Sequence, residues 1–261
     1  MQRIALTIAG SDSGGGAGIQ ADLKTFAAHG VYGVSVITAI TAQNTIGISA
    51  VAPLEADLVT AQMEAVMSDF GAHAAKTGML PTAAVVEAVA AAVADLEIPY
   101  LVVDPVICAS SGDRLMDDEA LAAMKAELLP RTFLVTPNTL EAEALSGVAI
   151  KTEADRHEAA RRIAALGPIA VVVTGGHFPS ADIVDLLYDG ERFVEMRAAR
   201  VPSAGTHGTG CTFAASITAH LALGRSVQEA ITLAQEYVAG AIRNAPGIGR
   251  GRGPMQHFWK R

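Results

Sequence analysis

A glycine-rich turn, residues 206–212 (Thr-His-Gly-Thr-Gly-Cys-Thr), runs directly into an apolar stretch with a helical pattern. Its glycines allow backbone conformations that other residues avoid, so consecutive N–H groups can converge on one point. The first N–H groups of a helix have no partner within it and lie at its positive end, where they can bind an anion. We therefore expect Gly208, Thr209 and Gly210 to bind an anion. The alternative is an ordinary glycine-rich helix start capped by threonine.

Cys211 lies in the first turn of the same expected helix. The positive end of a helix can lower the pKa of a thiol from about 8.5 toward neutrality. Such a thiolate can remove a proton from a hydroxyl group as a general base. The alternative is an inert buried cysteine, but the neighbouring anion-binding turn favours a catalytic role.

A second glycine-rich loop, residues 10–18, follows the first expected strand. Small residues such as Ala17 would let a planar ligand lie close to the backbone, and Asp12 and Asp22 offer hydrogen-bond acceptors. Gln43 follows the second expected strand, and its amide both donates and accepts hydrogen bonds. That amide suits the edge of a nitrogen heterocycle, although residues 42–44 could also form a plain surface turn.

Acidic and amide side chains follow two further strands. Asp104 ends one expected strand, and Asn138 and Glu141 come after another. If Pro137 starts a helix, Asn138 and Glu141 lie one turn apart on the same face. Oxygen ligands of this kind hold hydrated Mg²⁺ beside nucleotide phosphates. These residues predict a Mg²⁺ site, with Asn138 acting only as a helix cap as the alternative.

Short β-branched runs alternate with alanine-rich helical stretches along the chain. This alternation predicts βαβ units and an α/β fold with a mostly parallel, doubly wound sheet flanked by helices. In such sheets, ligands bind beyond the carboxyl ends of the strands, so the loops described above should meet. We expect strands at residues 3–9, 34–40, 100–104, 133–136 and 169–174, and helices at residues 19–28, 55–69, 82–96, 118–128, 152–166, 212–223 and 227–244.

Residues 182–188 and 192–197 break this alternation. They flank Asp189-Gly190-Glu191, which is typical of a hairpin turn, and predict antiparallel strands at one edge of the sheet. No linker, repeat or low-complexity segment divides the 261 residues. We therefore expect one domain that spans residues 1–261.

Charge and composition exclude several classes of protein. A formal net charge of −8 argues against a nucleic-acid partner, because phosphate backbones require a basic surface. The basic residues near the C-terminal end, residues 250–252 and 260–261, are interpreted as a solvated terminus. No apolar stretch reaches the roughly 18 residues that a membrane helix needs. Two cysteines cannot make a disulfide framework, so we expect a cytoplasmic protein without a membrane partner.

Common nucleotide and hydrolase motifs are also missing. The chain has no G-x-x-x-x-G-K-[ST] phosphate loop, no H-E-x-x-H and no G-x-S-x-G. The first loop lacks the G-x-G-x-x-G spacing of dinucleotide-binding folds. A dehydrogenase is therefore disfavoured.

The order and spacing of these motifs closely resemble the hydroxymethylpyrimidine/phosphomethylpyrimidine kinases of thiamin biosynthesis, in the ribokinase-like superfamily. The resemblance covers nearly the whole chain. It rests on residues 9–24, 42–45, 76–80 (Lys-Thr-Gly-Met-Leu), 104–106 (Asp-Pro-Val), 110–112, 136–141 (Thr-Pro-Asn-x-x-Glu), 175–177 (Gly-Gly-His), 206–211 and 253–258. Each motif alone is weak, but their combination is specific.

The resemblance implies ATP-dependent phosphorylation of 4-amino-5-hydroxymethyl-2-methylpyrimidine, and of its monophosphate, with Mg²⁺. It implies an anion hole of Gly208, Gly210 and Cys211, with Cys211 as the base where related vitamin and sugar kinases carry Asp. It also implies a pyrimidine site and a nucleotide–metal site. The pyrimidine site comprises Ala17, Asp22, Gln43, Met79 and Val106, and the nucleotide–metal site comprises Asn138, Thr174, Thr209, Asp104 and Glu141.

Thr174 departs from the family pattern, in which a lysine commonly precedes Gly-Gly-His. A threonine can hydrogen-bond to a phosphate but supplies no charge. Since pyridoxal kinases tolerate Thr at this place, a pyridoxal/pyridoxine kinase remains the alternative. A pyrimidine sensor without catalytic activity is an alternative from another class. An edge hairpin or an apolar helix face also leads us to expect a homodimer.

Overall fold

The computed structural model describes residues 2–109, 112–176, 182–203 and 205–260. Ser110, Ser111 and His177, which belong to two motifs of the resemblance, lie outside the described residues. The strands are β1 (Ile4–Asp12), β2 (Tyr32–Gln43), β3 (Ile48–Pro53), β4 (Ala74–Thr77), β5 (Leu101–Val103), β6 (Leu134–Val135), β7 (Ala170–Val173), β8 (Asp182–Tyr188) and β9 (Phe193–Ala199). The helices are α1 (Gly18–Ala28), α2 (Ala56–Asp69), α3 (Ala83–Asp95), α4 (Asp118–Ala123), α5 (Thr139–Ser146), α6 (Glu153–Ala164), α7 (Thr209–Ala222) and α8 (Val227–Arg243).

The nine strands of the described residues belong to one sheet, in the order β3-β2-β1-β4-β5-β6-β7-β8-β9. The six strands from β2 to β7 in this order run parallel, while β3 and the β8–β9 hairpin pair antiparallel at the two edges. The predicted α/β class, with a mostly parallel sheet and an edge hairpin, is confirmed. A second antiparallel strand, β3, lies at the opposite edge.

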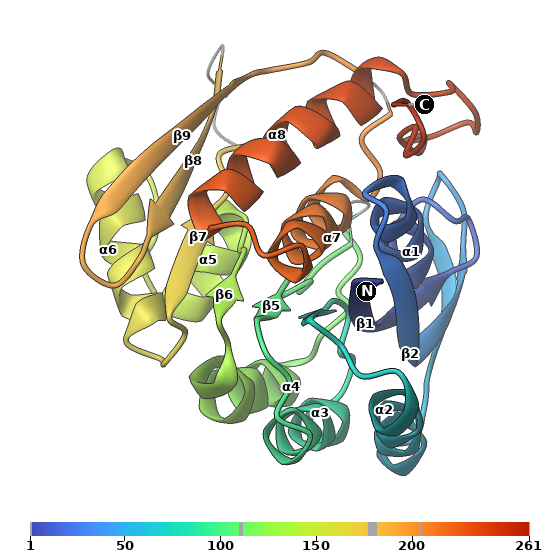
Figure 1. Ribbon diagram of the computed structural model, residues 1–261. Helices are drawn as coiled ribbons and strands as arrows, with labels where there is room; N and C mark the ends of the chain where they lie inside the picture. Colours follow the sequence, from blue (N-terminus) through green and yellow to red (C-terminus); the bar gives the residue numbers. More distant parts are fainter. Residues whose placement is uncertain (1, 110–111, 177–181, 204, 261) are drawn as a thin grey trace.

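Helices cover both faces of the sheet: α1, α7 and α8 lie on one face and α2 to α6 on the other (Figure 1). Successive side chains in a strand point to opposite faces, so β1 contributes to two cores. Leu6 and Ile8 belong to the core under α2 and α3, and Ala5 belongs to the core under α7 and α8. Strands β5 to β7 are buried along their length, which explains their continuous apolar sequences.

Two strands were not predicted. Strand β4 contains Lys76, whose charge interrupts the apolar run, and it is nevertheless fully buried between β1 and β5. Strand β3 is short, ends in Pro53 and is largely exposed, as edge strands often are. Helix α7 begins at Thr209, three residues earlier than expected. Among the described residues, no helix has the length and apolar character needed to cross a membrane.

Candidate active site

A cavity of about 1030 Å³ opens at the carboxyl ends of the parallel strands. The loops after β1, β2, β4, β5, β6 and β7 all contribute to its wall, together with the first turn of α7. This is the convergence expected for a doubly wound sheet. Every residue predicted for the site lines this cavity except Asp22.

The anion-binding turn is formed by the first residues of α7. Gly208 is the N-cap residue in a left-handed conformation (φ 81°), and a Cβ there would lie 1.9 Å from the carbonyl oxygen of Gly16. The close approach of these two loops therefore requires glycine. No side chain of the described residues caps this turn. The first-turn amides of Gly210 and Cys211 remain available to a ligand because they lie beyond the reach of the i→i−4 helix pattern.

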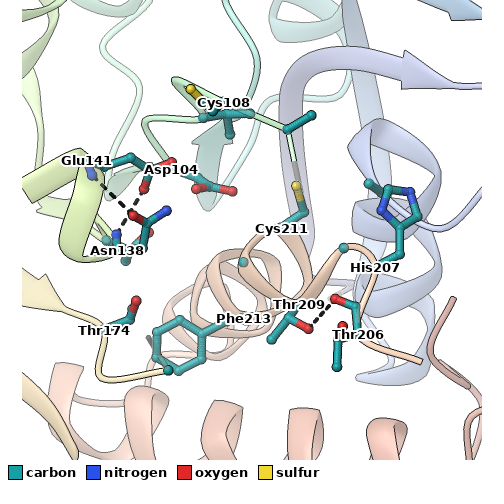
Figure 2. A pocket seen from close by; sticks show the side chains of 18 of the residues that line it. Asp104, Cys108, Asn138, Glu141, Thr174, Thr206, His207, Thr209, Cys211 and Phe213 are labelled. Carbon is teal, nitrogen blue, oxygen red and sulfur yellow. Dashed lines mark hydrogen bonds between the residues drawn. The ribbon is translucent and has the colours of Figure 1, made fainter. Parts of the chain in front are cut away.

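Thr209 uses both its hydroxyl and its amide for hydrogen bonds within the protein. Its hydroxyl donates to the carbonyl oxygen of Thr206 (2.7 Å), as Figure 2 shows, and its amide donates to the same oxygen (3.3 Å). The prediction that Thr209 binds the nucleotide therefore does not fit this geometry. Gly210, in contrast, is exposed, and the nearest atom to a Cβ placed there would be Oδ1 of Asp104 at 4.0 Å. The space over Gly210 is open toward Asp104.

Cys211 is partly exposed to the cavity, but its acidity is opposite to our expectation. Burial raises the pKa of the Cys211 thiol above its ordinary value, and the carboxylates of Asp104 and Asp22 add to the effect. Lys76 and the amide of Gly18, which donates to the sulfur, act in the other direction without compensating. The predicted lowering of this pKa is wrong. Desolvation outweighs the helix end, so Cys211 rests as a neutral thiol near pH 7.

Lys76 lies beneath this part of the cavity and was not assigned a role from the sequence. Its fully buried ammonium contacts both carboxylate oxygens of Asp22 (3.0 and 3.1 Å) and lies 3.8 Å from Oδ2 of Asp104. Burial alone would lower the pKa of Lys76, but Asp22, Cys211 and Asp104 together raise it above its ordinary value. Lys76 is therefore a fixed buried cation beside Asp22 and Asp104.

Asp22 belongs to this ion cluster and not to the substrate surface. Its side chain is fully buried, pairs with Lys76 and accepts a hydrogen bond from the Thr7 hydroxyl (2.6 Å). The prediction that Asp22 contacts the substrate does not agree with this placement. In the sequence, Asp22 looks available to a ligand. Its partner Lys76 lies 54 residues further along the chain, on β4, so no local pattern reveals the ion pair.

The first glycine-rich loop is organised by Asp12. Its carboxylate accepts hydrogen bonds from the amides of Gly14 (2.7 Å), Gly16 (3.0 Å) and Ala17 (2.8 Å) and lies 2.9 Å from Nε2 of His207. Burial would raise the pKa of Asp12, but these bonds outweigh it and lower the pKa. Asp12 is thus the internal anchor of the loop, and Ala17 presents a small wall to the cavity.

The remaining predicted pyrimidine residues, Gln43, Met79 and Val106, also line the cavity. Oε1 of Gln43 lies 3.2 Å from the Thr41 hydroxyl, which can donate to it, and Nε2 of Gln43 lies 3.4 Å from Nε2 of His207. Met79 packs against Gly10 under the loop. Val106 has φ 41°, which is strained for a β-branched residue. Strain of this kind is frequently stored where a side chain must point into a functional site.

The acidic wall contains Asp104, Asn138 and Glu141 (Figure 2). Asn138 caps α5: its Oδ1 accepts from the Glu141 amide (3.1 Å), while Oε2 of Glu141 accepts from the Asn138 amide (2.9 Å). The amide of Ile107 also donates to Glu141. The cap that we considered as an alternative is therefore present, and it leaves only the NH₂ group of Asn138 for a ligand.

Glu141 and Asp104 differ in whether their carboxylate oxygens accept hydrogen bonds. Burial, followed by repulsion from Asp104, raises the pKa of Glu141 to about 8, and burial also raises the pKa of Asp104. Oδ2 of Asp104 is buried and has no hydrogen-bond partner in the described structure. Its nearest cationic partner is the Lys76 ammonium at 3.8 Å, and a carboxylate oxygen that accepts no hydrogen bond suits a hard cation such as Mg²⁺. No group of three or more His, Cys, Asp or Glu side chains that could hold a metal ion gathers among the described residues.

Thr174 follows β7 and is half-buried on the cavity wall. Its amide donates to the carbonyl oxygen of Pro137 (2.9 Å), which joins the end of β7 to the start of α5. Arg114, Arg200 and Arg252 also line the cavity. The positive charge that a lysine would bring to position 174 is therefore not the sole cationic charge near the site.

Comparison with known proteins identifies the family. The profile of the phosphomethylpyrimidine kinase family matches residues 12–256. A hydroxymethylpyrimidine/phosphomethylpyrimidine kinase of Rhizobium meliloti is 49% identical over 266 residues, covering 100% of both chains.

Two solved structures are similar throughout. A pyridoxal kinase of Bacillus subtilis, solved as an ADP complex, has a TM-score of 0.90 and 41% identity and covers 98% of each chain. A phosphomethylpyrimidine kinase of Clostridium difficile has a TM-score of 0.83 and 41% identity, covering 92% of this chain and 100% of that one. The fold implied by the resemblance is confirmed. With nearly its whole length matched, the chain belongs to the phosphomethylpyrimidine kinase family.

Proposed function

We propose that this protein is an ATP-dependent kinase that phosphorylates 4-amino-5-hydroxymethyl-2-methylpyrimidine and then its monophosphate, in thiamin biosynthesis. The observation that carries this proposal is the uncapped first turn of α7, whose open side at Gly210 faces Asp104 across the cavity. Gln43 lies in the same cavity, so one enclosed space offers a phosphoryl site and a heterocycle site. The Rhizobium meliloti relative carries the same two activities in its name.

Phosphoryl transfer depends on positioning and on charge stabilisation more than on covalent chemistry. The amides of Gly210 and Cys211 stabilise the charge on the transferring group, as preorganised donors do in an oxyanion hole. The NH₂ group of Asn138 and the hydroxyl of Thr174 orient the nucleotide phosphates. Asp104 would provide a carboxylate oxygen for Mg²⁺, and Glu141 would support the wall and contribute through water. When bound, Mg²⁺ neutralises phosphate charge.

The Cys211 thiolate accepts the proton of the hydroxymethyl group as its oxygen attacks, after the resting thiol has released its own proton to solvent. Its raised pKa means that only a small fraction of the enzyme carries this thiolate at rest, and the alcohol step depends on that fraction. The monophosphate already presents an anionic oxygen and needs no base of this kind. The two steps should therefore differ in their dependence on Cys211.

The test is to measure both phosphorylations separately in Cys211→Ala, with products resolved as monophosphate and diphosphate. We expect the first step to slow by about 10²–10⁴ and the second far less, because loss of a general base has this size. Cys108→Ser is the matched control, since it removes the other cysteine of the chain. Equal small losses in both steps would remove Cys211 from the mechanism.

A pyridoxal kinase is the second candidate, favoured by the similarity to the Bacillus subtilis pyridoxal kinase. Parallel assays of ADP formation with the pyrimidine alcohol and with pyridoxal separate the two. Tight binding of the pyrimidine without any ADP formation would instead favour the non-catalytic sensor.

We also propose a single domain over residues 1–261, a homodimer and a cytoplasmic location. One sheet links all nine strands, which supports the single domain. The exposed edge strand β3, together with Ile40 and Ile46 nearby, offers an apolar surface to a second copy. Two free cysteines suit a reducing compartment. Sedimentation analysis tests the dimer. A protein that sediments only as a monomer would refute it.

A further inference from the structure

The glycine–arginine segment near the end of the chain, residues 249–254, lies across the loop that follows β2. We propose that this segment is a strap that positions Gln43 relative to the anion-binding turn, with Thr45 as its anchor. The inference rests on the proposed function, because it assigns the strap to the pyrimidine end of that site. Thr45 and the backbone of the strap are positioning elements, since they act on the ligand through Gln43 and His207, while the Arg252 side chain itself lines the cavity.

The anchor is a set of three hydrogen bonds on one residue. The Thr45 hydroxyl oxygen accepts from the amides of Arg250 (3.1 Å) and Gly251 (3.2 Å). The Thr45 carbonyl oxygen accepts from the amide of Arg252 (2.9 Å). Three consecutive amides of the strap thus converge on a residue two positions beyond Gln43.

The glycines of the strap are required by this contact. A Cβ at Gly249, which has φ 88°, would lie 2.4 Å from Cγ2 of Thr45. A Cβ at Gly251 would lie 2.0 Å from the Thr45 carbonyl oxygen. The alternation of glycine and arginine therefore reflects close packing against Thr45. Our interpretation of residues 250–252 as a solvated terminus is wrong for the backbone, which packs on Thr45, and for the Arg252 side chain, which lines both cavities.

The other end of the strap is attached to the anion-binding turn. The His207 amide donates to the carbonyl oxygen of Gly253 (3.1 Å), and His207 forms a parallel bridge with Pro254. Further along, the hydroxyl of Thr212 lies 3.1 Å from Nε2 of His257. One short segment thus contacts both the loop of Gln43 and the first turn of α7.

The residues that follow the strap, 256–259, are held on α8. The Tyr237 hydroxyl donates to the carbonyl oxygen of His257 (2.7 Å), and Nε1 of Trp259 donates to the carbonyl oxygen of Tyr237 (3.1 Å). The ring of Trp259 lies directly over Gly240, where a Cβ would be 2.1 Å from it. The two loops are therefore fixed to a buried helix and not merely to each other.

Both attachments meet at the heterocycle end of the cavity. Gln43 and His207, one from each loop, approach to 3.4 Å, and His207 also contacts Asp12 (2.9 Å). A smaller cavity of about 420 Å³ lies between these loops and the strap, and Arg252 lines both cavities. If the strap were released, the loop of Gln43 would have to be ordered when the pyrimidine binds, which weakens binding.

Thr45→Val tests the inference, because valine keeps the shape of threonine and removes the accepting hydroxyl. We expect the KM for the pyrimidine to rise about three- to tenfold, the effect of losing one or two partly exposed hydrogen bonds. The KM for ATP and the Tm should stay close to those of the wild type. Thr45→Ser retains the hydroxyl and should restore the pyrimidine KM.

Ser49→Ala is the matched control. Ser49 lies on the same hairpin and donates to the Ala42 carbonyl oxygen (3.0 Å), with no contact to the strap. We expect no change in either KM. A Thr45→Val protein whose two KM values rise together, or whose pyrimidine KM is unchanged, would overturn the inference.

Hydrogen exchange provides a readout that does not depend on turnover. Thr45→Val should speed amide exchange at residues 43–47, and Ser49→Ala should leave these amides unchanged. If the protein proves not to phosphorylate the pyrimidine but this exchange increases as expected, the proposed substrate is wrong and the strap is retained. Unchanged exchange in Thr45→Val would reject the strap even in an active enzyme.

Discussion

Gly210→Ala should separate the fold of this protein from its chemistry. Gly210 is the second residue of α7 and does not adopt a left-handed conformation. The nearest atom to an added methyl group is Oδ1 of Asp104 at 4.0 Å, an ordinary contact distance. Alanine is favoured over glycine in helices by up to about 1 kcal/mol. The variant should therefore fold at least as well as the wild type, with a Tm higher by up to about 2–4 °C.

Activity should nevertheless fall steeply. The methyl group would occupy the open side of the first turn, between its amides and Asp104, where the transferring phosphoryl group must approach. If the methyl group keeps the phosphoryl group away from the Gly210 amide, the effect equals the loss of one oxyanion-hole donor, which typically costs about 10²–10³ in kcat. We expect a loss of this size for both the alcohol and the monophosphate, because both need the same charge stabilisation. Coupled measurement of ADP formation and thermal unfolding of the same preparation give the two readouts.

Gly208→Ala is the contrasting variant. There φ is 81° and the added Cβ would lie 1.9 Å from the Gly16 carbonyl oxygen, so the fold itself must distort. We expect a lower Tm as well as lost activity. The reasoning would be refuted by Gly210→Ala with wild-type kcat, or by a Tm as low as that of Gly208→Ala.

Three further predictions follow from the buried and strained groups. Lys76→Met should lower the free energy of unfolding in urea by about 3–5 kcal/mol, because it leaves Asp22 charged and unpaired. The double variant Lys76→Met/Asp22→Leu should recover most of this loss. A loss under about 1 kcal/mol in the single variant would contradict the buried pair. Burial lowers the pKa of His257 to about 4, so the unfolded chain binds a proton first as the pH falls, and stability drops between about pH 6.5 and 4. His257→Gln should flatten this part of the curve of Tm against pH, and an unchanged slope would show that His257 is not responsible. Val106→Gly removes the strain at φ 41° and should keep or raise the Tm while raising the pyrimidine KM; a Tm loss would argue against strain.

The sites that could be predicted from the sequence are those where function depends on local chain geometry. Gly208 and Gly210 signal a turn with exposed amides, and Asp104 and Asn138 follow strand ends. The rule that parallel strands bring their following loops to one edge is enough to place these residues around a single cavity. The capping role of Asn138 was also visible, because a cap uses residues only three positions apart.

Prediction was poorest where the partner of a residue is distant in sequence. Asp22 on α1 looked available to a ligand, but it forms an ion pair with Lys76, which comes from strand β4. Strand β4 itself was overlooked because Lys76 is tolerated in a buried strand only through that pairing. The segment at residues 250–252 looked like a solvated tail, whereas its amides bind Thr45. No local pattern reports contacts across 54 or 205 residues.

The pKa of Cys211 shows most clearly what the sequence determines and what only the tertiary structure determines. The sequence by itself determined that a thiol would sit in the first turn of a helix beside unpaired amides, because helix ends are set by nearby residues. Only the tertiary structure decided how that thiol titrates, since desolvation and the charges of Asp104 and Asp22 come from elements packed around it. Position along a helix is a local property, whereas solvation and electrostatic potential are sums over everything that surrounds the atom.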